Sequence, residues 1–470
     1  MPYNDLREFI DRLEKEKELV RVRAQVDPDL EIGAIMRKVF DKRGKAILFE
    51  NVKGHEMPLL CGAMDTYKRY GLGIGCQPHP REILKKNLAA MRNPIPPIMV
   101  EKAPCQEIVL TGPEVDLNVF PVPKWNLLDG GKYIGTLGLV MVKDPQTGWR
   151  NMGIYREQIH GRNTMGLLAT QQVGVILTKY RDLGKPMPVA TVIGADPAIL
   201  ATSCFRMALG ADELGAAGGL RGEPVQLVKC KTVDMEVPAA AEIVIEGEIP
   251  PDAESWQVEG PFGEFSGYYG NVVDRLPTIH VKAIAMRRNP IFQGTLEGKP
   301  PSESTTLRTL GHSIGMWQRM EEARIPGFKE LWITDMGCAN FMTVIALDKQ
   351  YYSGNARQAI MAYWGMTHIG KWVIVVDADV DIFDGGQVEW ALATRVQPHR
   401  DIIITSDRDP GTNLDPSIPP EIRPYPYTRS SRIGIDATTQ FKGHDYPPLV
   451  THSPELMKKV ERRWEEYGIE

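Results

Sequence analysis

Near its middle the chain reads Glu259-Gly260-Pro261-Phe262-Gly263-Glu264, with a carboxylate on either side of a unit that continues neither a strand nor a helix. In a flat strand, residues five positions apart point to opposite faces of the sheet. A tight turn through Pro261 and Gly263 would instead bring Glu259 and Glu264 into one cavity. The stretch therefore predicts a turn that carries two neighbouring carboxylates.

A second polar stretch, Asn151-Met152-Gly153-Ile154-Tyr155-Arg156, supplies a cation that could pair with these carboxylates. If the Arg156 guanidinium reaches one of them, that carboxylate stays ionised. The pKa of the other, beside apolar walls and a like charge, would rise, so that it could act as an acid. Surface carboxylates that flank a loop are the alternative interpretation of the same pattern.

The residues around both stretches, from 111 to 310, are rich in strand patterns and poor in long helices. Turn residues separate the strands at short intervals, which favours a mixed or barrel-like sheet over a doubly wound one. We expect strands at residues 138–142, 189–193, 226–230 and 241–245, and one helix near residues 197–209.

The two regions that flank this strand-rich part have different sequence patterns. Residues 1–110 begin with a capped amphipathic helix and end near a proline cluster. Residues 311–470 alternate strand and helix patterns, which indicates an α/β domain that ends in a helix starting at Ser453. Further strands are expected at 46–49, 341–347, 372–376 and 401–405, helices at 80–91, 354–363 and 388–394, and a long proline-containing loop at 411–432. The sequence thus predicts a mixed α+β protein of three domains, 1–110, 111–310 and 311–470.

Composition and charge exclude several classes of partner. The 470 residues carry a formal net charge of -5 without a basic stripe, so nucleic acid is not an expected partner. No run approaches the roughly 18 apolar residues of a membrane span, and no signal peptide is visible. Six scattered cysteines indicate reduced thiols rather than a disulfide framework. We therefore expect a cytoplasmic protein.

Three weaker patterns have plainer explanations. The glycine-dense stretch 71–75 lacks the preceding strand of a dinucleotide fingerprint, so we expect a loop. Asp377, Asp379 and Asp381 follow a predicted strand and could hold a hard cation, although a solvated strand end is more common. No HExxH, HxxxH or GxSxG pattern occurs, which leaves no anchor for a zinc hydrolase or a serine nucleophile.

Motifs in one order along most of the chain resemble the UbiD family of reversible decarboxylases. Besides the two stretches above, the resemblance rests on Asp5-Leu6-Arg7-Glu8-Phe9-Ile10, Gly194-Ala195-Asp196-Pro197, Gly218-Gly219-Leu220-Arg221-Gly222-Glu223-Pro224, Val233-Asp234-Met235-Glu236-Val237-Pro238-Ala239 and Lys371-Trp372-Val373-Ile374-Val375-Val376-Asp377. It implies a central split β-barrel that binds a flavin. It also implies a C-terminal oligomerisation domain, with a homodimer or hexamer as the assembly.

The resemblance implies a catalytic set of Arg156, Glu259 and Glu264. Glu264 would protonate the carbon that CO2 leaves, and Glu259 would pair with Arg156 and position it. Residues implied at the cofactor are Asn151, Ile154, Tyr155, Arg156, Gln172, Glu213 and Lys371, with Lys371 on its phosphate.

By the same resemblance, Asn151, Gln172 and Glu213 would bind a divalent cation, Mn2+ or Mg2+, beside the cofactor phosphate. Relatives usually have a histidine where this chain has Gln172. An amide oxygen still binds a hard cation but lacks the preference of imidazole for transition metals. The backbone at residues 202–204 resembles a loop for a monovalent cation such as K+.

The implied cofactor is prenylated FMN, with a flavin prenyltransferase as its supplier. The implied reaction is the reversible, non-oxidative release of CO2 from an aromatic, heteroaromatic or α,β-unsaturated acid. Decarboxylation of such acids needs an electron sink that no ordinary side chain supplies. Two alternatives are an FMN-dependent oxidoreductase and a subunit of a multi-subunit carboxylase complex.

One geometric condition follows from the spacing. Asn151 and Arg156 have opposite parity, so a flat strand would send them to opposite faces. If both serve one site, the strand needs a bulge or a strong twist, and Gly153 is the expected position for it.

Overall fold

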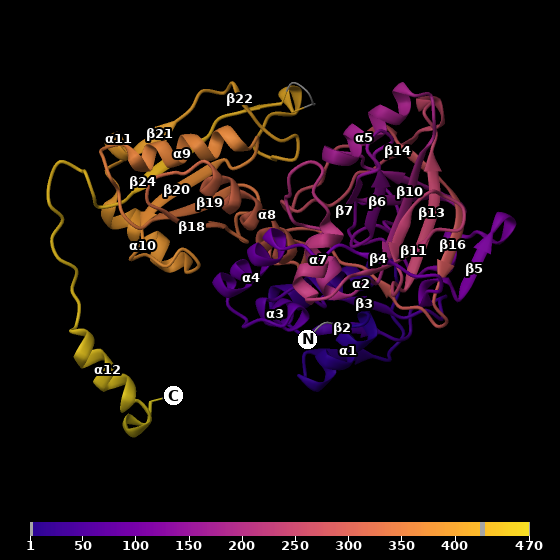
Figure 1. The fold of residues 1–470 in the computed structure, drawn as a ribbon, viewed down its shortest axis with the longest axis horizontal. Helices are drawn as coiled ribbons and strands as arrows, with labels where there is room; N and C mark the ends of the chain where they lie inside the picture. Colours follow the sequence, from indigo (N-terminus) through magenta and orange to yellow (C-terminus); the bar gives the residue numbers. More distant parts are fainter. Residues whose placement is uncertain (1–2, 424–427, 470) are drawn as a thin grey trace.

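The computed structural model describes residues 3–423 and 428–469. It has an N-terminal part, a central strand-rich part and a C-terminal sheet with helices, and its last helix stands away from the rest (Figure 1). Helices and sheets are mixed throughout, so the predicted α+β class is confirmed. Among the described residues, no helix is both long and apolar enough to cross a bilayer.

The order of the eight-stranded central sheet explains why it curls. Its strands follow β7–β6–β10–β13–β16–β9–β8, with β5 paired to β16. Their bounds are β5 (Ile108–Thr111), β6 (Leu139–Lys143), β7 (Arg150–Ile154), β8 (Glu157–Gly161), β9 (Thr164–Leu167), β10 (Met187–Ile193), β13 (Ile243–Ile249) and β16 (Thr278–Met286). Only Tyr155 and Arg156 join β7 to β8, although these strands lie at opposite ends of the order. Three Cα–Cα steps span at most about 11 Å, so the two ends must approach each other and the sheet forms a split barrel.

Both faces of the central sheet are buried, because its apolar residues alternate between two cores. In β6, Val140 and Val142 belong to one core, and Leu139 and Met141 belong to the other. A period of two sends successive side chains to opposite faces of a strand. The near-continuous apolar patterns of the predicted strands follow from this double burial.

The N-terminal part packs helices around a four-stranded sheet of order β1–β2–β3–β17. Its elements are α1 (Leu6–Lys15), β1 (Leu19–Val22), α2 (Glu31–Asp41), β2 (Ala46–Phe49), β3 (Leu59–Cys61), α3 (Tyr67–Ile74), α4 (Pro80–Arg92) and β17 (Phe292–Gln293). The Asp5 side chain caps α1 by accepting from the backbone N–H of Glu8. A separate three-stranded sheet has the order β12–β11–β4. Its strands are β4 (Ile98–Met99), β11 (Gln226–Lys229) and β12 (Glu236–Pro238).

The expectation of a loop at residues 71–75 is wrong, because Gly71 and Gly73 lie inside α3. A Cβ at Gly73 would come within 2.9 Å of the Pro197 Cβ at the start of α6 (Pro197–Thr202). The glycine therefore allows α3 to approach α6 closely, which no pattern in a single stretch of sequence reveals. Gly75 ends the helix at φ 68°, a conformation that favours glycine.

The C-terminal part is a five-stranded sheet of order β18–β19–β20–β24–β21 with helices beside it. Its elements are α8 (Glu303–Glu322), β18 (Phe328–Ile333), β19 (Met342–Leu347), α9 (Asn355–Met366), β20 (Trp372–Asp377), α10 (Gly385–Arg395), α11 (Pro398–Asp401), β21 (Ile402–Ile404) and β24 (Ile433–Ala437). The strands and helices predicted in this part are confirmed to within a few residues at each end.

The helix predicted near residues 197–209 is shorter, because α6 ends at Thr202. The chain beyond it crosses α8 very closely. A Cβ at Gly311 would lie 2.1 Å from the Cys204 carbonyl oxygen, and one at Gly315 would lie 2.4 Å from the Arg206 carbonyl oxygen. The backbone leaves the helix here and passes over this glycine face of α8.

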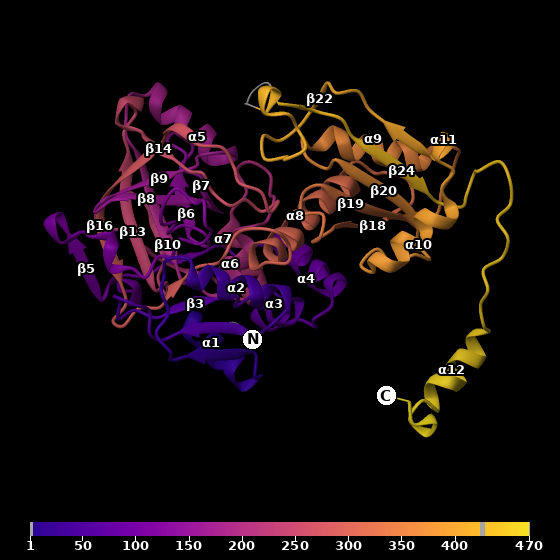
Figure 2. The ribbon, with the colours of Figure 1, turned by 180° about the vertical axis from the view of Figure 1, so that it is seen from behind.

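The chain ends in two extended features. A short strand pair, β22 (Asp409–Pro410) with β23 (Arg429–Ser430), joins the start of the loop predicted at residues 411–432 to its end, and residues 424–427 lie outside the described part. Beyond it, α12 (Pro454–Arg462) is capped by Ser453, as predicted, and has no buried residue. Figure 2 shows α12 apart from the other elements from behind as well. The oligomeric role of this region stays a prediction.

An acidic side chain is enclosed within the barrel beside Arg156. Glu157, the first residue of β8, is completely buried, and its Oε1 accepts from the Thr191 hydroxyl at 2.7 Å. Its Oε2 has no hydrogen-bond partner among the described residues. This oxygen packs against Gly135, where a Cβ would lie only 2.4 Å from it. Burial raises the pKa of Glu157 to about 8, so the folded chain holds this carboxyl protonated at neutral pH.

Stability should therefore fall with rising pH through Glu157. Because the pKa is higher in the folded chain than in the unfolded chain, its contribution is complete below about pH 4.5 and is lost at roughly 1.4 kcal/mol per pH unit up to about pH 8. Glu157→Gln should melt at the same temperature as the unsubstituted protein near pH 5 and at a higher temperature at pH 8. The exposed Glu114→Gln substitution should leave the melting temperature unchanged at both pH values. Equal melting temperatures of Glu157→Gln and the parent at pH 8 would contradict the burial argument.

Candidate active site

Arg156 lies at the seam of the split barrel, and its guanidinium contacts two carboxylates. Its Nη2 donates to Glu259 Oε2 at 2.6 Å, and its Nη1 contacts Glu264 Oε1. The three side chains are 8%, 0% and 9% exposed. The structure thus brings together the arginine and the two glutamates that the sequence singled out from separate stretches.

The two carboxylates stand at one end of a hairpin formed by β14 (Gln257–Glu259) and β15 (Val273–Leu276). Gly260 has φ 92°, which favours glycine, and it turns the chain away directly after Glu259. The Glu264 N–H donates to the Tyr268 carbonyl at 2.9 Å, and the Gly270 N–H donates to the Phe262 carbonyl at 2.8 Å. The loop is therefore a folded unit, as the Pro-Phe-Gly pattern predicted.

Two barrel residues hold this loop against Arg156. The Tyr133 hydroxyl donates to Glu259 Oε1 at 2.7 Å, and Gln158 Oε1 accepts from the Gly260 N–H at 3.0 Å. The Phe262 ring packs 4.3 Å from the Tyr133 ring, and the Arg156 guanidinium lies 5.4 Å from the same Phe262 ring. Glu259 is thus fixed from two sides, by the guanidinium and by the phenol.

The charges of the cluster keep Arg156 ionised. Burial by itself lowers the pKa of Arg156, but the carboxylates of Glu264 and Glu259 outweigh it, and the pKa is raised. The sequence argument considered a guanidinium that reaches one carboxylate, and in the structure it contacts both. Because two carboxylates share one guanidinium, one of them lacks a full counter-charge. Such an arrangement suits proton transfer.

The expected bulge at Gly153 is also wrong. β7 pairs with β6 in unbroken register from Arg150 to Ile154. Arg156 lies beyond the end of the strand, so the parity of the strand does not govern its direction. Gly153 has a different role, because a Cβ there would lie 2.8 Å from the Tyr155 ring; the glycine leaves room for that ring to fold back over the strand.

A second polar cluster lies farther back along β7. Asn151 Nδ2 donates to Gln172 Oε1 at 2.5 Å and to Glu213 Oε1 at 3.3 Å. Tyr155 extends the cluster, since its hydroxyl donates to Asn151 Oδ1 at 3.4 Å. Ile154 ends the same strand and is half-buried. The three residues implied as metal ligands therefore converge, although they come from three different elements.

The donor set of this cluster fits a hard cation and a phosphate. Glu213 is buried without a cationic partner among the described residues, and burial raises its pKa to about 8. It is the first residue of α7 (Glu213–Arg221), and Gln172 lies in the first turn of α5 (Gln171–Asp182). Helix N-termini favour anions, and a carboxylate with two amide groups suits an oxygen-binding cation. No three His, Cys, Asp or Glu side chains gather as metal ligands in residues 3–423 and 428–469.

Lys371 does not contact this cluster. Its Nζ donates to Asp415 Oδ2 at 3.0 Å and contacts Ser417 Oγ, both between β22 and β23. Its predicted contact with a cofactor phosphate stays a prediction. The hydroxyls of Thr202 and Ser203 donate to carbonyls of their own helix, and the cation loop predicted at residues 202–204 is likewise untested.

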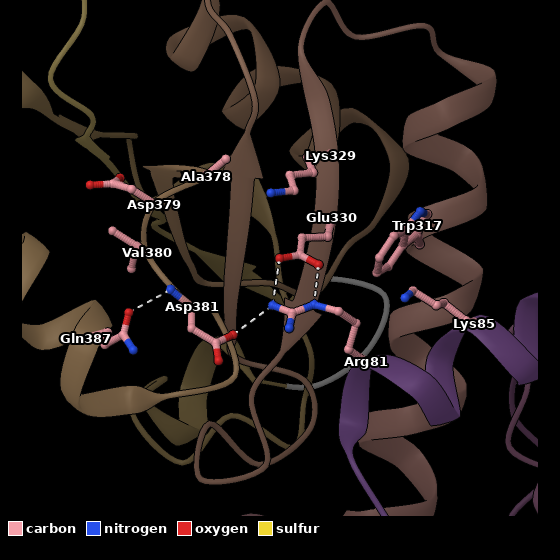
Figure 3. Close-up of a pocket in the computed structure, with 10 residues that line it drawn as sticks. All are labelled: Arg81, Lys85, Trp317, Lys329, Glu330, Ala378, Asp379, Val380, Asp381 and Gln387. Carbon is pink, nitrogen blue, oxygen red and sulfur yellow. Dashed lines mark hydrogen bonds and ion pairs between the residues drawn. The ribbon is translucent and has the colours of Figure 1, made fainter. Parts of the chain in front are cut away.

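Asp377, which ends β20, and Asp379 and Asp381 beyond it do not form a cation site. Asp377 and Asp379 pair with Arg395 at 3.3 and 2.6 Å. Asp381 pairs with Arg81, which also binds Glu330, at the edge of a hollow of about 640 Å³ (Figure 3). Each carboxylate thus has a guanidinium partner. The lining of this hollow includes none of the residues of the Arg156 or Asn151 clusters.

Sequence models of three domains match the chain, all described as 3-octaprenyl-4-hydroxybenzoate carboxy-lyase. They are the N-terminal domain over residues 10–87, the Rift-related domain over residues 98–300 and the C-terminal domain over residues 305–437. The chain belongs to the UbiD family. The family model and the solved UbiD-class structures support a carboxy-lyase.

Relatives of this UbiD chain cover nearly its whole length. A Synechocystis protein, the uncharacterized protein sll0936, is 34% identical over 99% of the chain and 96% of its own length. The UbiD-class enzyme HmfF from Pelotomaculum thermopropionicum, solved with FMN, is 34% identical, with a TM-score of 0.85 over 97% of this chain and 98% of its own. An evolved dimeric form of HmfF was solved with prFMN. Vanillic acid decarboxylase from Sedimentibacter hydroxybenzoicus is 30% identical, with a TM-score of 0.87 over 100% of both chains.

The UbiD motifs did not reveal every residue at the seam. Tyr133 and Gln158 were missed, although both contact the loop that carries Glu259. Gln158 gave no separate signal, since it lies in a strand with other polar residues, Glu157 and His160. No sequence signal pointed to Tyr133, because it lies more than 120 residues from Glu259 in sequence.

Proposed function

We propose that this UbiD carboxy-lyase releases CO2 reversibly and without oxidation from an aromatic, heteroaromatic or α,β-unsaturated acid. Prenylated FMN would be the cofactor, and Arg156, Glu259 and Glu264 the catalytic residues. The observation that carries the proposal is the buried guanidinium held between two carboxylates at the seam of the barrel. The FMN and prFMN complexes of HmfF support the cofactor, and vanillic acid decarboxylase supports an aromatic acid.

Arg156 binds and orients the carboxylate that is lost. A guanidinium makes two parallel, charge-assisted hydrogen bonds to a carboxylate. Glu264 now occupies Nη1, whereas Glu259 occupies Nη2 and is held by the Tyr133 hydroxyl. Because the Glu264 side chain has no such second support among the described residues, we expect the acid to displace Glu264 and leave Glu259 in place.

Glu264 holds the proton that replaces CO2. Once the acid has displaced Glu264 from Arg156, the Glu264 carboxylate takes up a proton from water and can donate it to the carbon that loses CO2, over a heavy-atom distance of about 3 Å. Its 9% exposure keeps bulk water from competing for that proton. Prenylated FMN, when bound, supplies the electron sink that the carbon needs and that no side chain offers. The same proton transfer in reverse permits carboxylation.

We also propose that Asn151, Gln172 and Glu213 hold a divalent cation that neutralises the cofactor phosphate. A cation would give the buried Glu213 carboxylate the counter-charge that it lacks among the described residues. The N-termini of α5 and α7 beside it favour the phosphate. With an amide from Gln172, the site suits Mg2+ or Mn2+ rather than a softer metal.

Glu264→Gln should lower the rate of CO2 release by about 10²- to 10⁴-fold, the usual contribution of a general acid. The chain would be expressed with a flavin prenyltransferase, and CO2 release would be followed over a panel of aromatic acids. Absorption spectra should find the same flavin content in the variant and the parent. The exposed Glu254→Gln substitution on the same segment is the matched control and should keep full activity.

Retained activity in Glu264→Gln with bound flavin would remove Glu264 from the catalytic set. Activity in the parent that appears only after a second polypeptide is added would favour the multi-subunit carboxylase. Bleaching of the flavin by NAD(P)H, without CO2 release, would favour an oxidoreductase.

Glu213→Gln should weaken Mn2+ binding by more than about 100-fold. Loss of a residue that only hydrogen-bonds to a metal ligand typically costs roughly 10- to 100-fold in affinity, and this substitution removes the charged ligand itself. Titration calorimetry and elemental analysis would measure this loss. Glu223→Gln, two residues beyond the C-terminal end of α7, where the side chain pairs with Arg221, should bind the metal as the parent does. Equal Mn2+ affinity of the Glu213→Gln variant and the parent would place the metal elsewhere.

A further inference from the structure

A loop of residues 125–133 packs against the part of the chain that carries Glu264. Both ends of this loop are buried, since Trp125 is 2% exposed and Tyr133 is 0% exposed. The Trp125 indole N–H donates to the Tyr133 carbonyl at 3.3 Å and closes the loop. Trp125 also lies against α2, because a Cβ at Gly33 would come within 2.0 Å of the Trp125 carbonyl oxygen. The 125–133 loop is therefore a closed unit with fixed ends.

The tip of this loop inverts the usual distribution of polar and apolar side chains. Leu127 and Leu128 are 69% and 59% exposed, whereas Asp129, the next residue, is 3% exposed. Asp is rarely buried unless its carboxylate is paired. The partners of Asp129 among the described residues are two backbone N–H groups, that of Asn126 on Oδ2 at 2.8 Å and that of Gly263 on Oδ1 at 2.9 Å. The buried carboxylate thus joins its own loop to the catalytic one.

Two further hydrogen bonds connect the same loop tip to the catalytic loop. The Gly130 N–H donates to the Pro261 carbonyl at 2.7 Å. The Leu128 N–H donates to the Tyr269 hydroxyl at 3.0 Å. The tip of the 125–133 loop therefore holds the chain on both sides of Glu264.

Asp129 acts on the residue that directly precedes Glu264. On the other side of Glu264, the Phe265 ring packs 4.0 Å from the Arg308 guanidinium of α8. Both neighbours of Glu264 are thus fixed, while its carboxylate is held, in the described part of the chain, by the guanidinium of the active site. This arrangement keeps the backbone in place and leaves the side chain free to exchange its partner.

We propose that Asp129 is a positioning residue for the proton transfer. Through the Gly263 N–H it fixes the Glu264 backbone, so that the carboxyl stays within reach of the substrate carbon after the acid has displaced it from Arg156. The inference rests on the proposed function, in which Glu264 donates the proton. A catalytic group that shifts by about 1 Å can lose about 10²-fold in rate, so this support matters most once the guanidinium has been given up.

Asp129→Asn removes one of the two hydrogen bonds with little change in shape. An amide has a single oxygen acceptor, so in either orientation its NH2 group faces one of the two N–H donors, Gly263 or Asn126. The test uses the flavin-loaded protein and the acid of the aromatic panel that the parent decarboxylates fastest. We expect kcat to fall about 10- to 100-fold. KM should stay within about twofold of the parent, because Arg156 still binds the acid.

Hydrogen exchange gives a readout that needs no substrate. In deuterated buffer, mass spectrometry should find that peptides over residues 257–270 exchange about tenfold faster in Asp129→Asn than in the parent, because the loop opens more often. Peptides over the buried strand β6 should exchange at the same rate in both proteins. The flavin content should also be equal.

Tyr269→Phe is a milder variant that keeps the test open if Asp129→Asn does not fold. It removes the hydroxyl that accepts from Leu128, on a side chain that is 37% exposed. We expect kcat to fall about 2- to 10-fold, as the loss of one neutral hydrogen bond allows, again with KM unchanged. The matched control is Asp274→Asn, exposed on β15, which should keep the kcat, KM and exchange rates of the parent.

An unchanged kcat, or a loss that appears only in KM, would overturn the positioning role of Asp129. Parent-like exchange of residues 257–270 in Asp129→Asn would do the same. The double variant with Glu264→Gln adds a further condition. If Asp129→Asn lowers the residual rate of Glu264→Gln by the same factor as it lowers the rate of the parent, its effect does not pass through Glu264 and the inference is wrong.

Comparison with Glu264→Gln separates this failure from failure of the proposed function. An impaired Glu264→Gln beside a fully active Asp129→Asn would leave the decarboxylase standing and remove only the positioning role. Full activity of Glu264→Gln, or no CO2 release from any acid, would contradict the proposed function and with it a role in proton transfer.

Discussion

The two-residue connection between β7 and β8 is the constraint on which the site depends. These strands lie at opposite ends of the order of the central sheet, so a link of Tyr155 and Arg156 forces the sheet to curl until its ends approach. The same link places Arg156 at the seam, between the two cores that bury the sheet. The position of the guanidinium is thus a consequence of topology rather than of a local motif.

A cation at that position must be balanced, because burial of an unpaired charge is expensive. The hairpin β14–β15 supplies two carboxylates, and Tyr133 fixes one of them. In the part of the chain that the structure describes, the other is held by the guanidinium and its own loop alone, which leaves it exchangeable. The difference in support between Glu259 and Glu264 gives two chemically identical side chains separate roles, one structural and one in proton transfer.

The sequence predicted the parts of the site that local rules govern. The Pro-Phe-Gly turn, the strand patterns and the capped first helix follow from residues close together in the chain. Residues that act through tertiary contacts were not predictable in this way. Gly73 seemed to belong to a loop because its close contact with Pro197 is invisible in sequence. Tyr133 was missed for the same reason, since it meets Glu259 across more than 120 residues.

The central claim is that the substrate carboxylate takes the place of Glu264 on Arg156, next to the proposed flavin. A crystal structure of the flavin-loaded Glu264→Gln protein with a bound acid tests it most directly. The expected result is a bidentate pair between the acid and the Arg156 guanidinium, with Glu259 and Tyr133 unmoved and the amide that replaces the Glu264 carboxyl turned towards the carbon that bears the carboxylate. An acid bound away from Arg156, or a flavin distant from the seam of the barrel, would contradict it.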